Sequence, residues 1–75
     1  MEITINDLLP IFREILEDDH LEISHETTAD DVRGWDSLNH IYLVVGIEKK
    51  FKKKFTSLQI QSWKCVGDII TDLNR

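Results

Sequence analysis

The stretch from residue 36 to residue 51, DSLNHIYLVVGIEKKF, decides the fold because it has the periodicity of one long helix. With an advance of about 100° per residue, its apolar side chains gather on two arcs. The arc expected to face a core contains Leu43, Val44, Ile47 and Phe51. The opposite arc contains Leu38, Ile41, Tyr42 and Val45. A helix in a small domain buries one such arc, so the second is either covered by another helix or is an exposed strip for a partner.

Upstream of this stretch, apolar residues three and four positions apart predict a first helix: Leu8, Leu9, Phe12, Ile15 and Leu16. Asn6 and Asp7 are its candidate N-caps, and Pro10 would lie in its first turn, where a missing N–H is tolerated. We expect this helix to end near Asp18 or Asp19. Residues 20–36 have no regular period and predict a long ordered loop.

Downstream, residues 56–62 predict a short helix. A last helix follows from apolar residues at helical spacing: Val66, Ile69, Ile70 and Leu73. It would be capped near Lys64 or Cys65. The expected fold is therefore all-α, a small four-helix bundle of three longer helices and one short helix. The chain has 75 residues, no internal repeat and no linker composition, so residues 1–75 predict a single domain.

Composition excludes several classes of protein. A single cysteine closes no intramolecular disulfide, and the three histidines form no Cys/His cluster, so we expect no metal site. No apolar run approaches the roughly 18 residues of a membrane span. The N-terminal residues lack the basic start and apolar stretch of a signal peptide, which predicts a cytoplasmic protein.

The charges are distributed unevenly along the chain. The net charge is -5, which argues against binding to nucleic acid because no basic excess is present to neutralise phosphates. Residues 1–48 contain 12 acidic and 2 basic residues, whereas residues 49–75 contain 2 acidic and 7 basic residues. The lysines at positions 49–54 either complement the end of the long helix or face an anionic partner or membrane.

Asp36 and Ser37 stand where the long loop meets the long helix. Asp36 is a good N-cap, and Ser37 would be the first helical residue, with its hydroxyl near the positive end of the helix dipole. Backbone N–H groups there favour an attached phosphate group. The same pair also serves as an ordinary helix cap, and the two residues alone do not distinguish these roles. A triad of Ser37, His40 and Asp36 has poor geometry because neighbours on one helix start cannot form the required relay.

A wider pattern resembles the acyl carrier protein family. It comprises the run Gly34-Trp35-Asp36-Ser37-Leu38, the helix ending at Phe51, and Val66-Gly67-Asp68. The spacing between these motifs follows the family pattern, and the resemblance covers essentially the whole chain. It implies that Ser37 receives a covalent 4'-phosphopantetheine arm from coenzyme A through a phosphopantetheinyl transferase. It also implies that Asp36 caps the helix and helps to position that reaction.

The resemblance further implies a carrier without catalytic residues, which holds acyl groups as thioesters for acyl-loading and acyl-processing enzymes and is monomeric. Leu38, Ile41 and Val45 correspond to the family's partner-facing positions. The same three residues belong to the second arc of the helix, so the helical spacing and the resemblance indicate the same surface independently. Glu48 is the one acid of the helix after Asp36, and it completes the predicted partner-binding set.

The helix departs from the family in its charge. Fatty-acid-synthesis carriers have several acids on this helix, and here lysines follow Glu48 instead. This difference favours a specialised carrier, such as one serving a polyketide-like or polysaccharide-modifying pathway, over a housekeeping fatty acid carrier. The alternative is a helical interaction module that docks through Leu38, Ile41, Tyr42 and Val45 and leaves Ser37 unmodified.

Overall fold

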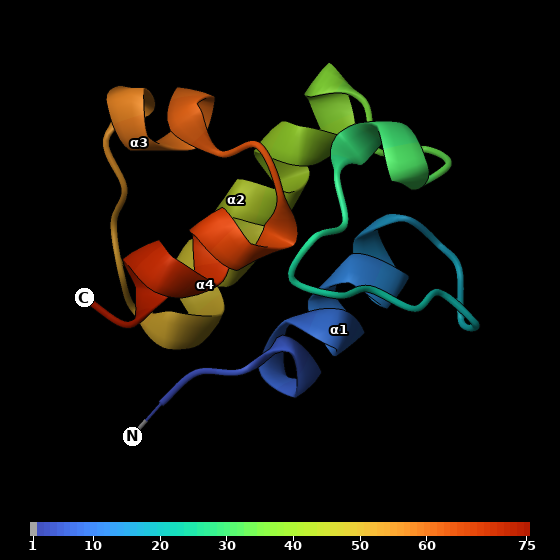
Figure 1. Ribbon diagram of the computed structural model, residues 1–75, viewed down its shortest axis with the longest axis horizontal. Coiled ribbons are helices and arrows are strands. Elements are labelled where there is room, and N and C mark those ends of the chain that lie inside the picture. Colours follow the sequence, from blue (N-terminus) through green and yellow to red (C-terminus); the bar gives the residue numbers. More distant parts are fainter. Residues whose placement is uncertain (1) are drawn as a thin grey trace.

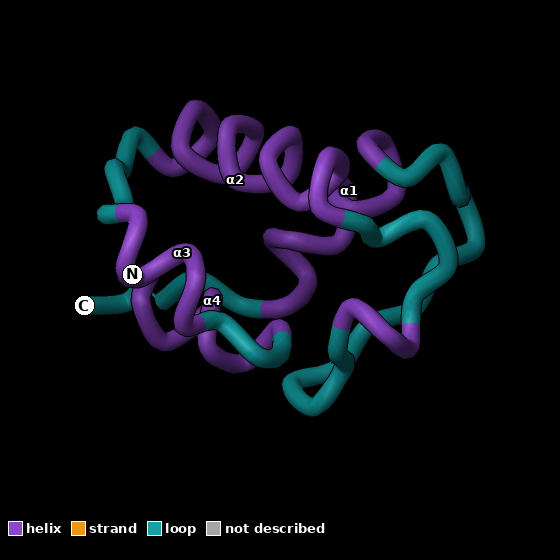
Figure 2. Tube along the Cα trace, turned by 90° about the horizontal axis from the view of Figure 1, so that it is seen from above, coloured by secondary structure: helices purple, strands orange, loops and turns teal. Residues whose placement is uncertain are grey.

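The computed structural model describes residues 2–75, and within them the chain forms four α-helices and one short 3-10 turn. The α-helices are α1 (Ile5–Ile15), α2 (Ser37–Phe51), α3 (Ser57–Ser62) and α4 (Val66–Leu73), and the 3-10 turn η1 is Ala29–Asp31. Figure 1 shows α4 in front of α2, with α1 below both. In Figure 2, α1 and α2 lie on one side of the molecule and α3 and α4 on the other, with the long loop around one end. The all-α fold predicted from the sequence is confirmed.

The core is built from one face of each of the three longer helices. Its fully buried side chains are Leu8 and Phe12 from α1, Leu43 and Ile47 from α2, and Val66, Ile69 and Leu73 from α4. Val32 and Trp35 from the long loop close the same cluster. The first apolar arc of α2 therefore faces the core, as its spacing predicts. Among residues 2–75, no helix is long and apolar enough to cross a membrane.

Helix α1 differs at both ends from the sequence prediction. Its N-cap is Thr4, whose N–H donates to the carboxylate of Asp7 at 2.9 Å, so the helix starts earlier and Pro10 lies in its second turn. It ends at Ile15 because Glu17 adopts a left-handed conformation with φ 54°. The N–H of Asp18 then closes onto the carbonyl of Arg13 at 3.0 Å, which terminates the helix. Polar side chains beyond Leu16 gave no sign of this reversal.

The long loop is held to the start of α4 by two backbone hydrogen bonds. The N–H of Val66 donates to the carbonyl of Thr27, and the N–H of Gly67 donates to the carbonyl of His25, both at 2.9 Å. A Cβ atom at Gly67 would lie 3.0 Å from that His25 carbonyl oxygen. The glycine is therefore needed for close approach, and the first N–H groups of α4 find acceptors in the loop. The loop also contains η1, which the sequence pattern did not predict.

The ends of the described chain are joined by a reciprocal pair of hydrogen bonds. The N–H of Ile3 donates to the side-chain oxygen of Asn74 at 2.7 Å, and the amide nitrogen of Asn74 donates to the carbonyl of Ile3 at 2.9 Å. These contacts connect the segment before α1 to the residue that ends α4. They link two elements that are far apart in the sequence.

Candidate functional site

Ser37 is the first residue of α2, and its side chain is exposed. Asp36 is the N-cap, and its Oδ1 accepts the N–H of Asn39 at 2.9 Å while its backbone carbonyl accepts the N–H of His40 at 2.8 Å. The capping prediction is therefore confirmed. Because Ser37 precedes the first intrahelical hydrogen bonds, its backbone N–H points out of the helix at the positive end of the dipole.

The turn before Ser37 is set by Gly34 and Asn39. Gly34 has φ +87°, a left-handed conformation that side chains rarely adopt. Its carbonyl accepts the side-chain amide of Asn39 at 2.6 Å and the N–H of Asp36 at 3.0 Å. The loop is thereby fastened to the first turn of the helix that carries the serine, which holds the position of Ser37.

Trp35 anchors this turn in the core. It is 8% exposed, and its ring packs edge-on against Phe12 with 5.1 Å between centroids. Its indole Nε1–H donates to Nδ1 of His40 at 3.1 Å, and the two rings are stacked. The imidazole of His40 in turn meets the edge of Trp63, which packs on Phe55. His40 is thus half-buried, with its Nδ1 accepting one hydrogen bond.

Beside Ser37 lies an open cavity of about 410 Å³ between the start of α2 and the end of α3. Its lining combines aromatic, apolar and polar side chains: Ala29, Trp35, Asp36, Ser37, His40, Ile60, Gln61 and Trp63. A group attached to the Ser37 hydroxyl would therefore have this cavity next to it. The sequence alone did not reveal the cavity because α3 and the loop are brought together only by the tertiary fold.

The site does not have the arrangement of a serine hydrolase. Oδ1 of Asp36 is directed to the backbone of Asn39, and Nδ1 of His40 accepts from Trp35, so neither group orients the other toward Ser37. Among the described residues 2–75, no group of three or more His, Cys, Asp or Glu residues could hold a metal ion.

The second arc of α2 is exposed. Leu38 and Ile41 are each 59% exposed, Tyr42 is 51% exposed and Val45 is 44% exposed. Within residues 2–75 no other helix covers this strip, so of the two alternatives left by the sequence the exposed strip is the correct one. We call these four residues the apolar strip.

Glu48 is placed differently from the apolar strip. It is half-buried, and its Oε2 accepts the N–H of Phe55 at 2.9 Å. One of its carboxylate oxygens therefore holds the connection between α2 and α3. Sequence reasoning missed this role because the contact joins residues on either side of a turn whose path was unknown.

Comparison with known proteins gives one clear match. The chain is similar to the solution NMR structure of a holo acyl carrier protein from Geobacter metallireducens, with 40% sequence identity and a TM-score of 0.88. The match covers 93% of this chain and 80% of that one. A scan against protein-family models finds no match, and a search of curated proteins finds none either.

Proposed function

Because the chain belongs to the acyl carrier protein family, and is thus a carrier of acyl groups rather than an enzyme, we propose that Ser37 is the residue that carries its 4'-phosphopantetheine group. The observation that supports this assignment is the exposed hydroxyl of Ser37 at the first position of α2, inside the run Asp36-Ser37-Leu38.

The residues around Ser37 fit a phosphate-linked group. The N–H groups of the first helical turn and the helix dipole favour an anion at this position. The carboxylate of Asp36 uses Oδ1 for the cap, and its Oδ2 makes no hydrogen bond within residues 2–75. When bound, the arm supplies a terminal thiol that carries acyl groups as thioesters. The part of this chain is to present the serine on a rigid helix start and to leave space beside it.

We assign partner binding to Leu38, Ile41 and Val45. Glu48, the fourth predicted member of the set, is half-buried with its Oε2 held by the N–H of Phe55, so we assign it to the turn after α2 instead. The first three are large exposed apolar residues on one face of α2. The partners are a phosphopantetheinyl transferase and the enzymes that load and process the acyl group. We further propose that residues 1–75 act as one monomeric domain in the cytoplasm.

Intact-mass measurement tests the attachment site. The protein is incubated with coenzyme A and a promiscuous phosphopantetheinyl transferase, and the wild type should gain the mass of one phosphopantetheine. Ser37→Ala should gain nothing. Ser57→Ala is a matched control because Ser57 is also an exposed first residue of a helix, and it should be modified like the wild type. A wild type that gains no mass would instead favour the helical interaction module.

We propose a specialised pathway, polyketide-like or polysaccharide-modifying, over housekeeping fatty acid synthesis. The support is that α2 has no acidic residue between Ser37 and Ile47, where fatty-acid carriers of this family have several. The test is a charging and elongation assay with the general fatty-acid enzymes of the host. Slow or absent elongation on the modified protein is expected, and efficient elongation would rule this pathway assignment out.

A further inference from the structure

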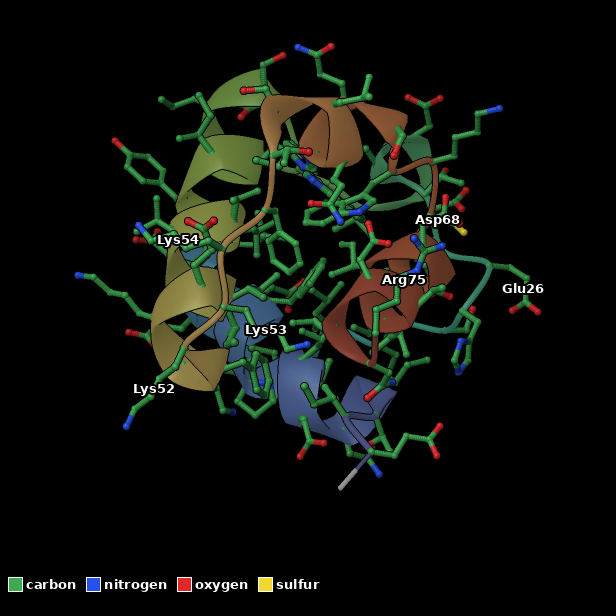
Figure 3. The ribbon with its side chains drawn as sticks, turned by 90° about the vertical axis from the view of Figure 1, so that its left-hand side faces the viewer. Glu26, Lys52, Lys53, Lys54, Asp68 and Arg75 are labelled. Atoms are coloured by element: carbon green, nitrogen blue, oxygen red, sulfur yellow. The ribbon has the colours of Figure 1, made fainter. Side chains whose placement is uncertain are left out.

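The apolar strip of α2 continues into two exposed lysines. With an advance of about 100° per residue, Lys49 falls on the same arc as Leu38, Ile41, Tyr42 and Val45. Lys52, which ends the helix in a left-handed conformation, follows three residues later on this side. In Figure 3 the side chain of Lys52 points away from the body of the protein. The surface therefore has an apolar part near Ser37 and a basic part at the far end of the helix.

The charges of these two lysines are not neutralised within the described residues 2–75. The ion pairs found there are Arg13–Glu22 and Arg75–Asp72, and neither involves a lysine. Glu14 borders the same groove beside α1 as Lys49, but the two do not come within ion-pair distance. Lys49 and Lys52 are therefore free to meet a complementary charge on a partner.

Neighbouring lysines have a different arrangement. Lys50 donates from Nζ to the carbonyl of Asp7 at 2.9 Å, and Lys53 donates to the carbonyl of Arg75 at 3.1 Å. Figure 3 shows Lys53 directed inward, toward the end of the chain. These two lysines tie helix ends together, whereas Lys49 and Lys52 make no such contact. Lys49 and Lys50 both complement the helix dipole in the last turn of α2, but of these two Lys49 is the one in line with the apolar strip.

Building on the proposed function, we infer that the enzymes served by this carrier recognise it through an apolar groove that has an acidic patch at one end. The groove receives the apolar strip, and the acidic patch meets Lys49 and Lys52. Glu48 precedes Lys49, and one of its carboxylate oxygens is held by the N–H of Phe55 in the turn after α2. Because the apolar part and the basic part lie at opposite ends of α2, docking in this way also fixes the direction of the helix on the partner. It therefore sets which end of α2 points to the partner's catalytic site.

A protein partner fits this surface better than a membrane. A helix that lies in a lipid interface has basic residues along both flanks of its apolar face. Here one flank has the uncharged Asn39 and Gly46, and the other has Ser37 and the acidic Glu48. The lysines in line with the apolar strip are confined to the last turn and the cap of α2. The negative net charge of -5 also opposes adsorption to an anionic bilayer.

Two synthetic peptides provide the test. Both are amphipathic helices of about 18 residues with the same leucine face, and the flanking positions at one end are Glu in one peptide and Lys in the other. Isotope-labelled full-length protein is titrated with each while backbone amide shifts are recorded. The Glu peptide should give saturable shifts in residues 38–52 and bind at least about threefold more tightly than the Lys peptide, with the preference falling as salt is added.

Charge reversals identify the residues responsible. Lys49→Glu and Lys52→Glu should each abolish or invert the preference for the Glu peptide, whereas Lys64→Glu, an exposed lysine outside α2, should leave it unchanged. Equal binding of both peptides, no shifts in α2, or an unchanged preference in Lys49→Glu would overturn the inference. So would binding to phosphatidylglycerol vesicles that is lost in Lys49→Glu. Ser37→Ala should show the same peptide preference, because the peptides test the surface of α2 and not the attachment site. The mass assay tests the attachment site alone, so the two proposals can fail independently.

Discussion

The indole of Trp35 and the imidazole of His40 are joined by a hydrogen bond of 3.1 Å that spans the start of helix α2. Trp35 precedes Ser37 by two residues and His40 follows it by three. Ser37 therefore lies in the segment from Trp35 to His40, which we call the Trp35–His40 bracket. The side chains at its two ends are hydrogen-bonded to each other, and Trp35 is buried in the core. This bracket gives a carrier without disulfides a fixed point at which to present an attached group.

The Trp35–His40 bond should appear as coupling in a double-mutant cycle. Trp35→Phe removes the donor, and His40→Ala removes the acceptor and leaves a largely buried N–H unpaired. Each should lower the free energy of unfolding by about 1–3 kcal/mol. The double variant should lose about 1 kcal/mol less than the sum, because the bond can be lost only once. Chemical denaturation measures all four proteins, and strictly additive losses would show that the bond contributes nothing.

Two glycines should respond in opposite ways to alanine. Gly67→Ala places a Cβ 3.0 Å from the carbonyl oxygen of His25, a backbone atom already held by a hydrogen bond, and should lower stability by about 1–3 kcal/mol. Gly46→Ala meets only the Cγ2 of Ile11 at 3.3 Å. Since alanine favours a helix over glycine by about 1 kcal/mol, this variant should keep or gain stability. Thermal unfolding compares them, and an equally mild effect at Gly67 would contradict the close approach of loop and α4.

Glu48 should act as a structural acceptor. Glu48→Ala should lower the free energy of unfolding by about 1 kcal/mol and accelerate hydrogen exchange at the amide of Phe55. Glu48→Gln keeps an oxygen acceptor and should preserve most of the protection. If the Phe55 amide exchanges at the same rate in all three proteins, the carboxylate does not hold the turn.

Asp36 allows its two proposed roles to be separated. Asp36→Asn keeps a good N-cap acceptor and should leave stability within about 0.5 kcal/mol of the wild type, whereas Asp36→Ala should lose about 1 kcal/mol. Both lack the carboxylate, so both should receive phosphopantetheine at least about tenfold more slowly, a change of about 1.4 kcal/mol in the barrier. A time course of intact mass gives the rates. Transfer to Asp36→Asn at the wild-type rate would limit Asp36 to its capping role.

The sequence predicted those parts of the fold that depend on local periodicity. The two arcs of α2 separated correctly into buried Leu43 and Ile47 and exposed Leu38 and Ile41, because spacing along a helix determines which side chains share a face. The Asp36 cap was equally local. Whether another helix covers the second arc could not be predicted, because that depends on where α3 lies, and only the tertiary structure determines its position.

The errors have physical causes that a linear pattern does not contain. The end of α1 was placed too late because Glu17, not a glycine, takes the left-handed conformation there. The close approach at Gly67 and the side-chain hydrogen bonds of Glu48 and His40 were not predicted. Each connects residues on either side of a turn or loop, whose path the sequence does not give. Asp36 and Ser37 were placed at the start of α2 from the sequence because a helix start is a local feature, whereas the cavity beside them was not predicted.

The reciprocal hydrogen bonds between Ile3 and Asn74 hold the segment before α1 next to the residue that follows α4. A short linker across this point would make the chain continuous, and new ends could then be opened in the exposed turn at Lys52 without cutting a core helix. A circular permutant of this kind would keep the Trp35–His40 bracket and the loop bonds to α4 intact. The order in which the helices are synthesised would change, while the presentation of Ser37 would not.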